Sequence, residues 1–207
     1  MNIQIDTNNY FKSDYDTKER FISYWYQINE IISLKPASIL EIGVGNSFVS
    51  NYLKKKGFEV TTLDIEPGLK PDIVGSVLSI PFSPNSFDVV ACYEVLEHLP
   101  YKNFSKALAE IYRVCKNYAI ISLPDRRRVY RFNLQIPRLG EVKKLIPLPG
   151  VRKIHDQHYW EIGGEIKFSM ILSEINRRGF IIKKNYRIFE HPYHRFIIAE
   201  KNRRKVC

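Results

Sequence analysis

The sequence predicts an α/β protein with a doubly wound, mostly parallel sheet of seven strands, an antiparallel last strand and helices on both faces. Short apolar runs alternate with segments of helical periodicity through the first 123 residues. The first run ends in Gly43 and Gly45, and a helical pattern follows at once. The chain closes with two β-rich segments joined across Glu190-His191-Pro192.

Residues 17–33 are expected to form an amphipathic helix capped by Asp16 or Thr17, because apolar and aromatic side chains recur there at helical spacing. A buried strand follows at 38–43. The next helix is expected to run from Asn46 to about Lys56 and to end at Gly57, which suits a left-handed position. Three further strands and a helix are expected at 58–64, 72–74, 87–93 and 104–115.

The second half begins with a fifth apolar run, 118–123, of the kind that parallel sheets bury on both faces. Residues 124–162 are rich in proline, arginine, lysine and aromatics and show no long clean period. A helix at about 165–178 ends at Gly179, and the closing hairpin takes 180–189 and 193–199. We therefore expect a single domain, 1–207, with an N-terminal helix at 17–33 and a basic insert or lid at 124–162.

Composition is that of an ordinary globular domain, since 44% of the 207 residues are hydrophobic and 26% are charged. Residues 1–6 lack the basic and apolar parts of a secretory signal, and no apolar run approaches the ~18 residues of a transmembrane segment. Cys92, Cys115 and Cys207 are scattered without metal-ligand spacing. A reducing, cytoplasmic location is expected.

Charge divides unevenly along the chain. Residues 1–120 hold 12 Lys/Arg and 14 Asp/Glu, whereas residues 121–207 hold 20 and 8, so the net charges are −2 and +12. This asymmetry indicates an anionic substrate or surface that contacts residues 126–153, and a membrane surface or nucleic acid would qualify. The alternative is a solvated basic face, and nucleic acid is the less favoured partner.

The segment Glu41-Ile42-Gly43-Val44-Gly45-Asn46-Ser47 carries the most specific chemistry. Two glycines let the backbone approach a ligand closely, and the following helix offers unpaired N–H groups. Glu41 would repel a pyrophosphate but suits an ammonium group. A dinucleotide pattern, Gly-x-Gly-x-x-Gly, would place its last glycine at Phe48. The segment therefore favours a zwitterionic amino-acid nucleoside over a dinucleotide.

Asp64 ends the second strand, 21 residues after Gly43. A carboxylate at that place can accept both ribose hydroxyls of a nucleoside that lies across the strand ends. Glu66-Pro67-Gly68 follows, so a role as a turn residue is the alternative.

The segment from Glu41 to Ser47 resembles the first motif of class I S-adenosylmethionine-dependent methyltransferases, acid-x-Gly-x-Gly-x-Gly, with Ser47 at the third glycine. Residues 86–99 are similar to the fourth-strand motif of the type 11, ubiquinone-biosynthesis-like group. The resemblance covers 36–124 well and the closing helix and hairpin more loosely. It implies a Rossmann-like fold, S-adenosyl-L-methionine as cofactor, and methyl transfer to a small-molecule or lipid-like acceptor, anionic if the basic insert binds it.

The resemblance also implies a set of cofactor-binding residues. Ile65 and Val77 would lie against the adenine, Ser76 stands where the family carries an acid, and Cys92 and Tyr93 would form the face beneath the sulfonium. The expected cofactor-binding residues are Glu41, Gly43, Val44, Gly45, Asn46, Ser47, Asp64, Ile65, Ser76, Val77, Cys92 and Tyr93.

His98, His158 and Tyr159 are the candidate catalytic residues. Methyl transfer mainly requires alignment and exclusion of water, and a general base is needed only for a hydroxyl or protonated amine acceptor. His98 follows the fourth strand, although it could simply bond the local backbone. The cluster at 155–161 is expected on the acceptor side. No spacing rule supports a metal site of His155, Asp156 and His158, so no metal is expected.

Two other functions stay open from the sequence alone. A nicotinamide-dependent oxidoreductase would share Asp64, but Glu41 and Phe48 disfavour it. A non-catalytic nucleic-acid- or membrane-binding module could retain a nucleoside pocket and use the basic C-terminal part.

Overall fold

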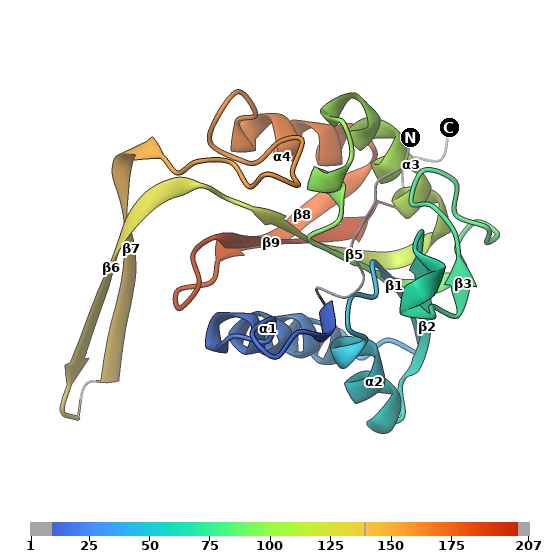
Figure 1. The fold of residues 1–207 in the computed structure, drawn as a ribbon, viewed down its shortest axis with the longest axis horizontal. Helices are drawn as coiled ribbons and strands as arrows, with labels where there is room; N and C mark the ends of the chain where they lie inside the picture. Colours follow the sequence, from blue (N-terminus) through green and yellow to red (C-terminus); the bar gives the residue numbers. More distant parts are fainter. Residues whose placement is uncertain (1–9, 139, 203–207) are drawn as a thin grey trace.

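The computed structural model describes residues 10–138 and 140–202 and contains a seven-stranded sheet in the order β3-β2-β1-β4-β5-β9-β8 (Figure 1). The first five strands pair in parallel, whereas β9 is antiparallel to both of its neighbours. This confirms the predicted doubly wound sheet. The strands of the sheet are β1 (Ser38–Ile42), β2 (Glu59–Asp64), β3 (Ile73–Val74), β4 (Phe87–Tyr93), β5 (Cys115–Pro124), β8 (Phe180–Arg187) and β9 (His194–Lys201).

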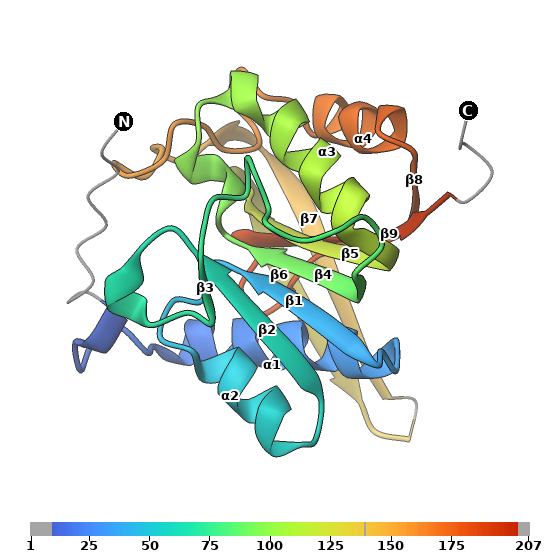
Figure 2. The same ribbon diagram turned by 90° about the vertical axis from the view of Figure 1, so that its right-hand side faces the viewer.

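Helices cover both faces of the sheet. α1 (Lys18–Ser33) and α2 (Phe48–Lys55) lie on one face, and α3 (Phe104–Val114) and α4 (Phe168–Arg177) lie on the other (Figures 1 and 2). Each face buries its own apolar cluster, one against α3 and α4 and one against α1 and α2. Three short 3₁₀ turns are η2 (Pro67–Leu69), η3 (Leu96–His98) and η4 (Tyr101–Asn103). None of the helices in the described ranges is long and apolar enough to cross a bilayer.

The helix ends follow the local signals in the sequence. Thr17 caps α1, because its hydroxyl accepts a hydrogen bond from the Arg20 amide at 3.3 Å. Gly57 and Gly179 follow α2 and α4 with φ of +87° and +100°, which is the left-handed conformation expected after a helix end.

The strand order places a crevice between β1 and β4. The chain runs outward from β1 to β2 and β3, and then returns to the other side of β1 to build β4 and β5. Ligands of open α/β sheets bind at such a reversal, outside the carboxyl ends of the strands. The end of β1 carries the predicted glycine segment, so this crevice is where the site is built.

The insert contains a regular β-ribbon, which the sequence patterns did not identify. β6 (Arg127–Ile136) and β7 (Gly140–Val151) pair in antiparallel fashion and project from the body (Figure 1). Neither strand joins the main sheet. Its side chains are mostly exposed, so it lacks the continuous apolar runs that marked the other strands.

A buried ion cluster anchors the root of this ribbon. Asp125 is 1% exposed and follows β5 directly. Its carboxylate accepts hydrogen bonds from Arg127 at 2.6 Å and Arg195 at 2.8 Å, and Arg187 lies 3.7 Å away. The cluster therefore joins the ribbon to β8 and β9.

Candidate functional site

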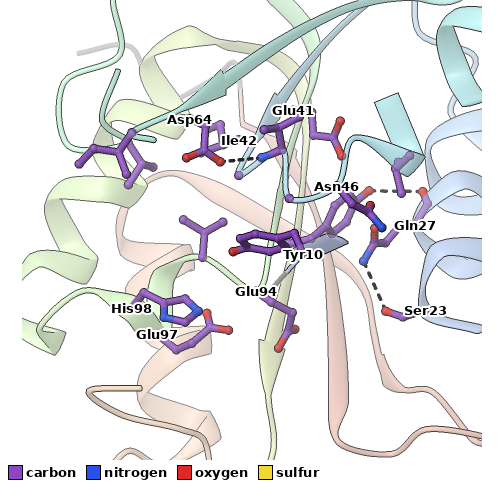
Figure 3. Close-up of a pocket in the computed structure, with 18 of the residues that line it drawn as sticks. Tyr10, Ser23, Gln27, Glu41, Ile42, Asn46, Asp64, Glu94, Glu97 and His98 are labelled. Carbon is purple, nitrogen blue, oxygen red and sulfur yellow. Dashed lines mark hydrogen bonds between the residues drawn. The ribbon is translucent and has the colours of Figure 1, made fainter. Parts of the chain in front are cut away.

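A cavity of about 480 Å³ opens at the carboxyl ends of β1, β2 and β4 (Figure 3). One end is formed by the turn after β1, the end of β2 and residues 75–77. The other end is formed by the turn after β4, the segment 155–158, and Tyr193 and His194. Residues of α1 and the ring of Tyr10 complete the wall.

The turn from β1 into α2 depends on two glycines. Gly43 has φ of +83°, and a Cβ at this position would overlap the side chain of Val95. Gly45 has φ of +52° and faces the Tyr10 ring, whose nearest carbon would lie 3.6 Å from an added Cβ. Both glycines are therefore needed for backbone conformation, and Gly43 also for close packing.

Asn46 and Ser47 of this turn were both predicted to bind the cofactor. The Asn46 side chain donates to Asp16 at 3.0 Å and accepts from the Phe48 amide at 3.1 Å, while its residue also lines the cavity. Ser47 precedes α2 with φ of +62° and does not line the cavity. The structure therefore brings Asn46, but not Ser47, to the site.

Asp64 ties the ends of β1 and β2 together. Its Oδ2 accepts from the Val44 amide at 2.8 Å, and its Oδ1 accepts from the Glu66 amide at 2.9 Å. Burial raises the pKa of Asp64, although the backbone amides that donate to it oppose that rise. A carboxylate has about four lone-pair sites, so both oxygens can still accept a hydrogen bond from a ligand.

Glu41 is a buried carboxyl on the same cavity wall. It is 4% exposed, and within the described part of the chain its Oε2 has no hydrogen-bond partner. Burial raises the pKa of Glu41 to about 8, while a hydrogen bond from Ser50 lowers it. An ammonium group placed here would pair with the open oxygen and favour the ionised form.

The ends of β2, β3 and β4 supply further residues that were predicted to bind the cofactor. Ile65, Ser76 and Val77 line the cavity, and the Ser76 hydroxyl accepts from the Leu78 amide at 3.2 Å. Tyr93 also lines it and donates to the Gln27 carbonyl at 3.3 Å. Cys92 is fully buried in the core on the α3 and α4 side and does not line the cavity, because successive side chains of a strand alternate between faces.

His98 and His158 meet at the other end of the cavity, with ring centroids 4.8 Å apart. His98 Nδ1 lies 3.1 Å from the Gln157 carbonyl, and His158 Nδ1 lies 2.8 Å from Glu161 Oε1. Because both partners are acceptors, each Nδ1 carries the hydrogen and each Nε2 is left with a lone pair in the neutral ring. Burial and the neighbouring His158 lower the pKa of His98 to about 4, so His98 is neutral at pH 7.

Tyr159 does not join these histidines. Its ring is 53% exposed and is not part of the cavity lining, while its backbone amide donates to the Glu97 carbonyl at 2.9 Å. The predicted catalytic set is therefore reduced to His98 and His158.

Three carboxyl groups that the sequence analysis did not select stand beside the histidines. Glu94 and Glu97 line the cavity (Figure 3). Glu161 accepts from the Tyr193 hydroxyl at 2.7 Å. Burial raises the pKa of Glu94 to about 7, and burial with the charge of Glu94 raises the pKa of Glu97 further. The acids of Glu94-Val95-Leu96-Glu97-His98 directly follow a buried strand, and this spacing was the available signal.

A metal-type donor set lies among these groups. One ligand atom each from Glu97, His98 and His158 fall within 4.8 Å of one another. A carboxylate with two imidazoles is a set that divalent transition metals accept. The trio considered from the sequence differs, because Asp156 is a solvent-exposed partner of Lys153.

Part of the chain is similar in sequence to known proteins. Residues 40–123 match the family model of the methyltransferase domain. An uncharacterized protein of Methanocaldococcus jannaschii is 38% identical over 86 residues, which cover 38% of this chain and 36% of that protein. Within residues 40–123 the chain is therefore similar to a methyltransferase domain.

Two further similarities are to proteins named as methyltransferases. The chain is 26% identical over 127 residues to a ubiquinone biosynthesis O-methyltransferase of Xylella fastidiosa, covering 45% of this chain and 52% of that protein. Magnesium protoporphyrin IX methyltransferase of Synechocystis PCC 6803, with bound S-adenosylhomocysteine, superposes with a TM-score of 0.64 and 15% identity, over 94% of this chain and 92% of that one. The chain spans about half or less of the length of these curated relatives.

The matched segment supplies only part of the cavity lining. Residues 40–123 contain the glycine turn, Asp64 and the strand end with Glu94, Glu97 and His98. His158, Glu161 and Tyr193 lie outside it, as does α1. The segments outside the match therefore supply much of the far end of the cavity.

Proposed function

We propose that this chain transfers the methyl group of S-adenosyl-L-methionine to a hydroxyl group of a small-molecule acceptor. The observation that carries the proposal is a single cavity with two different ends. One end joins a glycine turn to Glu41 and Asp64, and the other pairs His98 with His158.

The first end suits the cofactor by its donor and acceptor groups. The open oxygen of Glu41 would bind the ammonium group, and Asp64 would accept the ribose hydroxyls. Ile65 and Val77 would lie against the adenine, with Ser76 and Tyr93 nearby. Val44, Gly45 and Asn46 would pass along the methionine part.

The cofactor supplies a methyl carbon already activated by the positive sulfur, so the protein has to align the acceptor and remove its proton. Glu161 holds His158 with Nδ1 protonated, which leaves Nε2 to take the acceptor's hydroxyl proton. With the cofactor bound, the acceptor oxygen would take the methyl group as its proton passes to His158, and the sulfur would keep the electron pair of the S–C bond. The products are a methyl ether, the imidazolium of His158 and neutral S-adenosylhomocysteine.

The surroundings of the histidines favour an uncharged acceptor rich in hydroxyl groups. The Glu161 carboxylate beside His158 would oppose an anion, and none of the described residues of 126–153 lines the cavity. The basic insert predicted to bind the acceptor therefore does not support an anionic one. The O-methyltransferase names of the curated relatives support oxygen as the acceptor atom.

The two alternative functions are less favoured. An oxidoreductase would have to place a pyrophosphate near buried Glu41, and a purely binding module has no need for the paired histidines. Cytoplasmic location and single-domain organisation stay predictions. Cys92 and Cys115 are free, buried thiols, which agrees with a reducing compartment.

The test uses catechol as a probe acceptor and methyl-labelled cofactor. His158→Gln should lower the transfer rate by about 10²–10⁴-fold, the usual contribution of a general base, while S-adenosylhomocysteine affinity stays within about twofold. His191→Gln, outside this cavity, is the matched control. An unchanged rate in His158→Gln would remove the histidine from the chemistry.

A parallel arm with EDTA separates two roles of the histidines. Activity that EDTA leaves intact supports a direct base. Activity that EDTA abolishes and a divalent metal restores would instead make Glu97, His98 and His158 metal ligands.

A further inference from the structure

The β6–β7 ribbon presents one apolar face. In the register of the ribbon Tyr130 is opposite Ile146 and Leu134 is opposite Val142, and Phe132 lies between them on the same side. These five residues, Tyr130, Phe132, Leu134, Val142 and Ile146, are called the ribbon face below.

The ribbon face is turned away from the body. Arg131 and Lys143 stand on the opposite face, where they donate to the Glu190 carbonyl at 2.7 Å and to Glu190 Oε1 at 3.0 Å. The five apolar residues are 43–67% exposed. Two-stranded ribbons are marginally stable on their own, so an uncovered apolar face of this kind indicates a missing partner.

The charge around the ribbon face limits what that partner can be. Residues 126–153 contain nine Lys/Arg and one Asp/Glu, a net charge of +8. Lys144 is paired with Phe132 and so stands on the ribbon face itself. Arg128 is exposed at the irregular part of the register between Arg127 and Val129, next to the ribbon face. The partner must therefore offer apolar surface and negative charge together.

We propose that the ribbon face docks onto the anionic surface of a lipid bilayer. Its aromatic and aliphatic side chains enter the boundary between head groups and acyl chains, and Arg128 and Lys144 bind lipid phosphates. A second copy of the chain fits less well. Ten residues at about 3.3 Å each and two strands about 4.8 Å wide give a strip on the order of 300 Å², well below the roughly 800 Å² per partner of a stable interface. Two copies would also bring two segments of charge +8 together.

The test is co-sedimentation of the full chain with vesicles of phosphatidylcholine alone or with about one third phosphatidylglycerol. Binding to the anionic vesicles should exceed binding to neutral ones by about tenfold and fall with added salt. Phe132→Ser should weaken that binding at least about fivefold, while Ile181→Ser, an equally exposed position on β8, should not. Lys144→Glu should weaken it as well, and Lys102→Glu, the same change of charge on η4, should not.

Thermal unfolding and S-adenosylhomocysteine binding of each variant show that the body remains folded, so failure of this proposal is distinct from failure of the proposed function. Absence of binding to anionic vesicles would overturn the proposal, as would equal losses for Phe132→Ser and Ile181→Ser. A concentration-dependent dimer that Phe132→Ser dissolves would assign the ribbon face to a second copy. Stronger binding to duplex DNA, unaffected by Phe132→Ser, would assign the charge to nucleic acid.

Discussion

Glu41 and Asp64 show how two carboxyl groups in one cavity acquire different tasks. Backbone amides of Val44 and Glu66 already donate to Asp64, so it fixes the glycine turn and can accept ribose hydroxyls as well. Glu41 is more deeply buried and keeps one oxygen open. A nearby cation would therefore stabilise the ionised form of Glu41 more than that of Asp64. For this reason we expect the titration of Glu41 to respond to binding of the proposed cofactor.

We predict that affinity for S-adenosylhomocysteine rises from pH 6 to pH 8. Burial raises the pKa of free Glu41 to about 8, and pairing with the ligand's ammonium lowers it, so binding at pH 6 must release a proton. The rise can reach about tenfold per pH unit and should level off above pH 8. Calorimetry at pH 6, 7 and 8 measures it.

Glu41→Gln should abolish this pH dependence, whereas Glu94→Gln, a carboxyl at the other end of the cavity with a pKa of about 7, should retain it. The raised pKa also means that the folded chain holds a proton which the unfolded chain has released between about pH 4.5 and 8. Stability of the ligand-free protein attributable to Glu41 therefore falls as the pH rises through that window. An unchanged pH dependence in Glu41→Gln would separate Glu41 from the ligand.

Residue types and spacing predicted most of the residues that line the cavity near the glycine turn, but not the direction of every side chain. The family resemblance implied that Cys92 lies beneath the sulfonium, whereas the pleat of β4 turns its side chain into the core. Glu161 was not singled out within the cluster at 155–161, because its contact with His158 exists only in the folded loop. The face of the sheet on which a strand-end side chain lies cannot be predicted until the last residue of the strand is known.

At the scale of elements, burial decided what could be predicted. β4 and β5 contain continuous apolar runs, and both were predicted as strands of the main sheet. In the ribbon, Tyr130, Phe132 and Leu134 alternate with polar residues, which is a strand pattern. Prolines and basic residues around it obscured that pattern, and no core burial marked its inner side.

The ribbon root offers a prediction about stability. Asp125→Asn should lower the free energy of unfolding by about 3 kcal/mol, because Arg127, Arg187 and Arg195 lose a buried counter-ion. Denaturant titration measures the change. Asp156→Asn, whose partner Lys153 is as exposed as itself, should change it by no more than about 0.5 kcal/mol.

The contribution of Asp125 to the free energy of unfolding depends on pH, and its sign follows from the same contacts. Burial raises the pKa of Asp125, but hydrogen bonds from Arg127 and Arg195 outweigh it and the pKa is lowered overall. The contribution of Asp125 is therefore present above the ordinary aspartate pKa and is lost as the pH falls through the lowered value. Equal stability of Asp125→Asn and the parent at pH 7 would contradict a structural role for the cluster.

At the scale of the whole molecule, the cavity is built from the segment that matches the methyltransferase family model and from segments outside it. The matched segment, 40–123, brings the turn after β1, the end of β2 and the end of β4 to one crevice. α1, the segment 155–158 and the turn before β9 close the far end. Fold and cofactor class were predictable because they rest on local motifs, whereas the acceptor depends on segments far apart in the sequence.

The most direct test of this account is calorimetric titration of the purified chain with S-adenosylhomocysteine and, separately, with NAD. We predict saturable binding of S-adenosylhomocysteine and none of NAD. Asp64→Asn should weaken that binding at least about tenfold, since one hydrogen bond to a charged group contributes about 1.5–3 kcal/mol, while Asp156→Asn leaves it unchanged. Indifference to S-adenosylhomocysteine, or full affinity in a folded Asp64→Asn variant, would contradict the site described for this cavity.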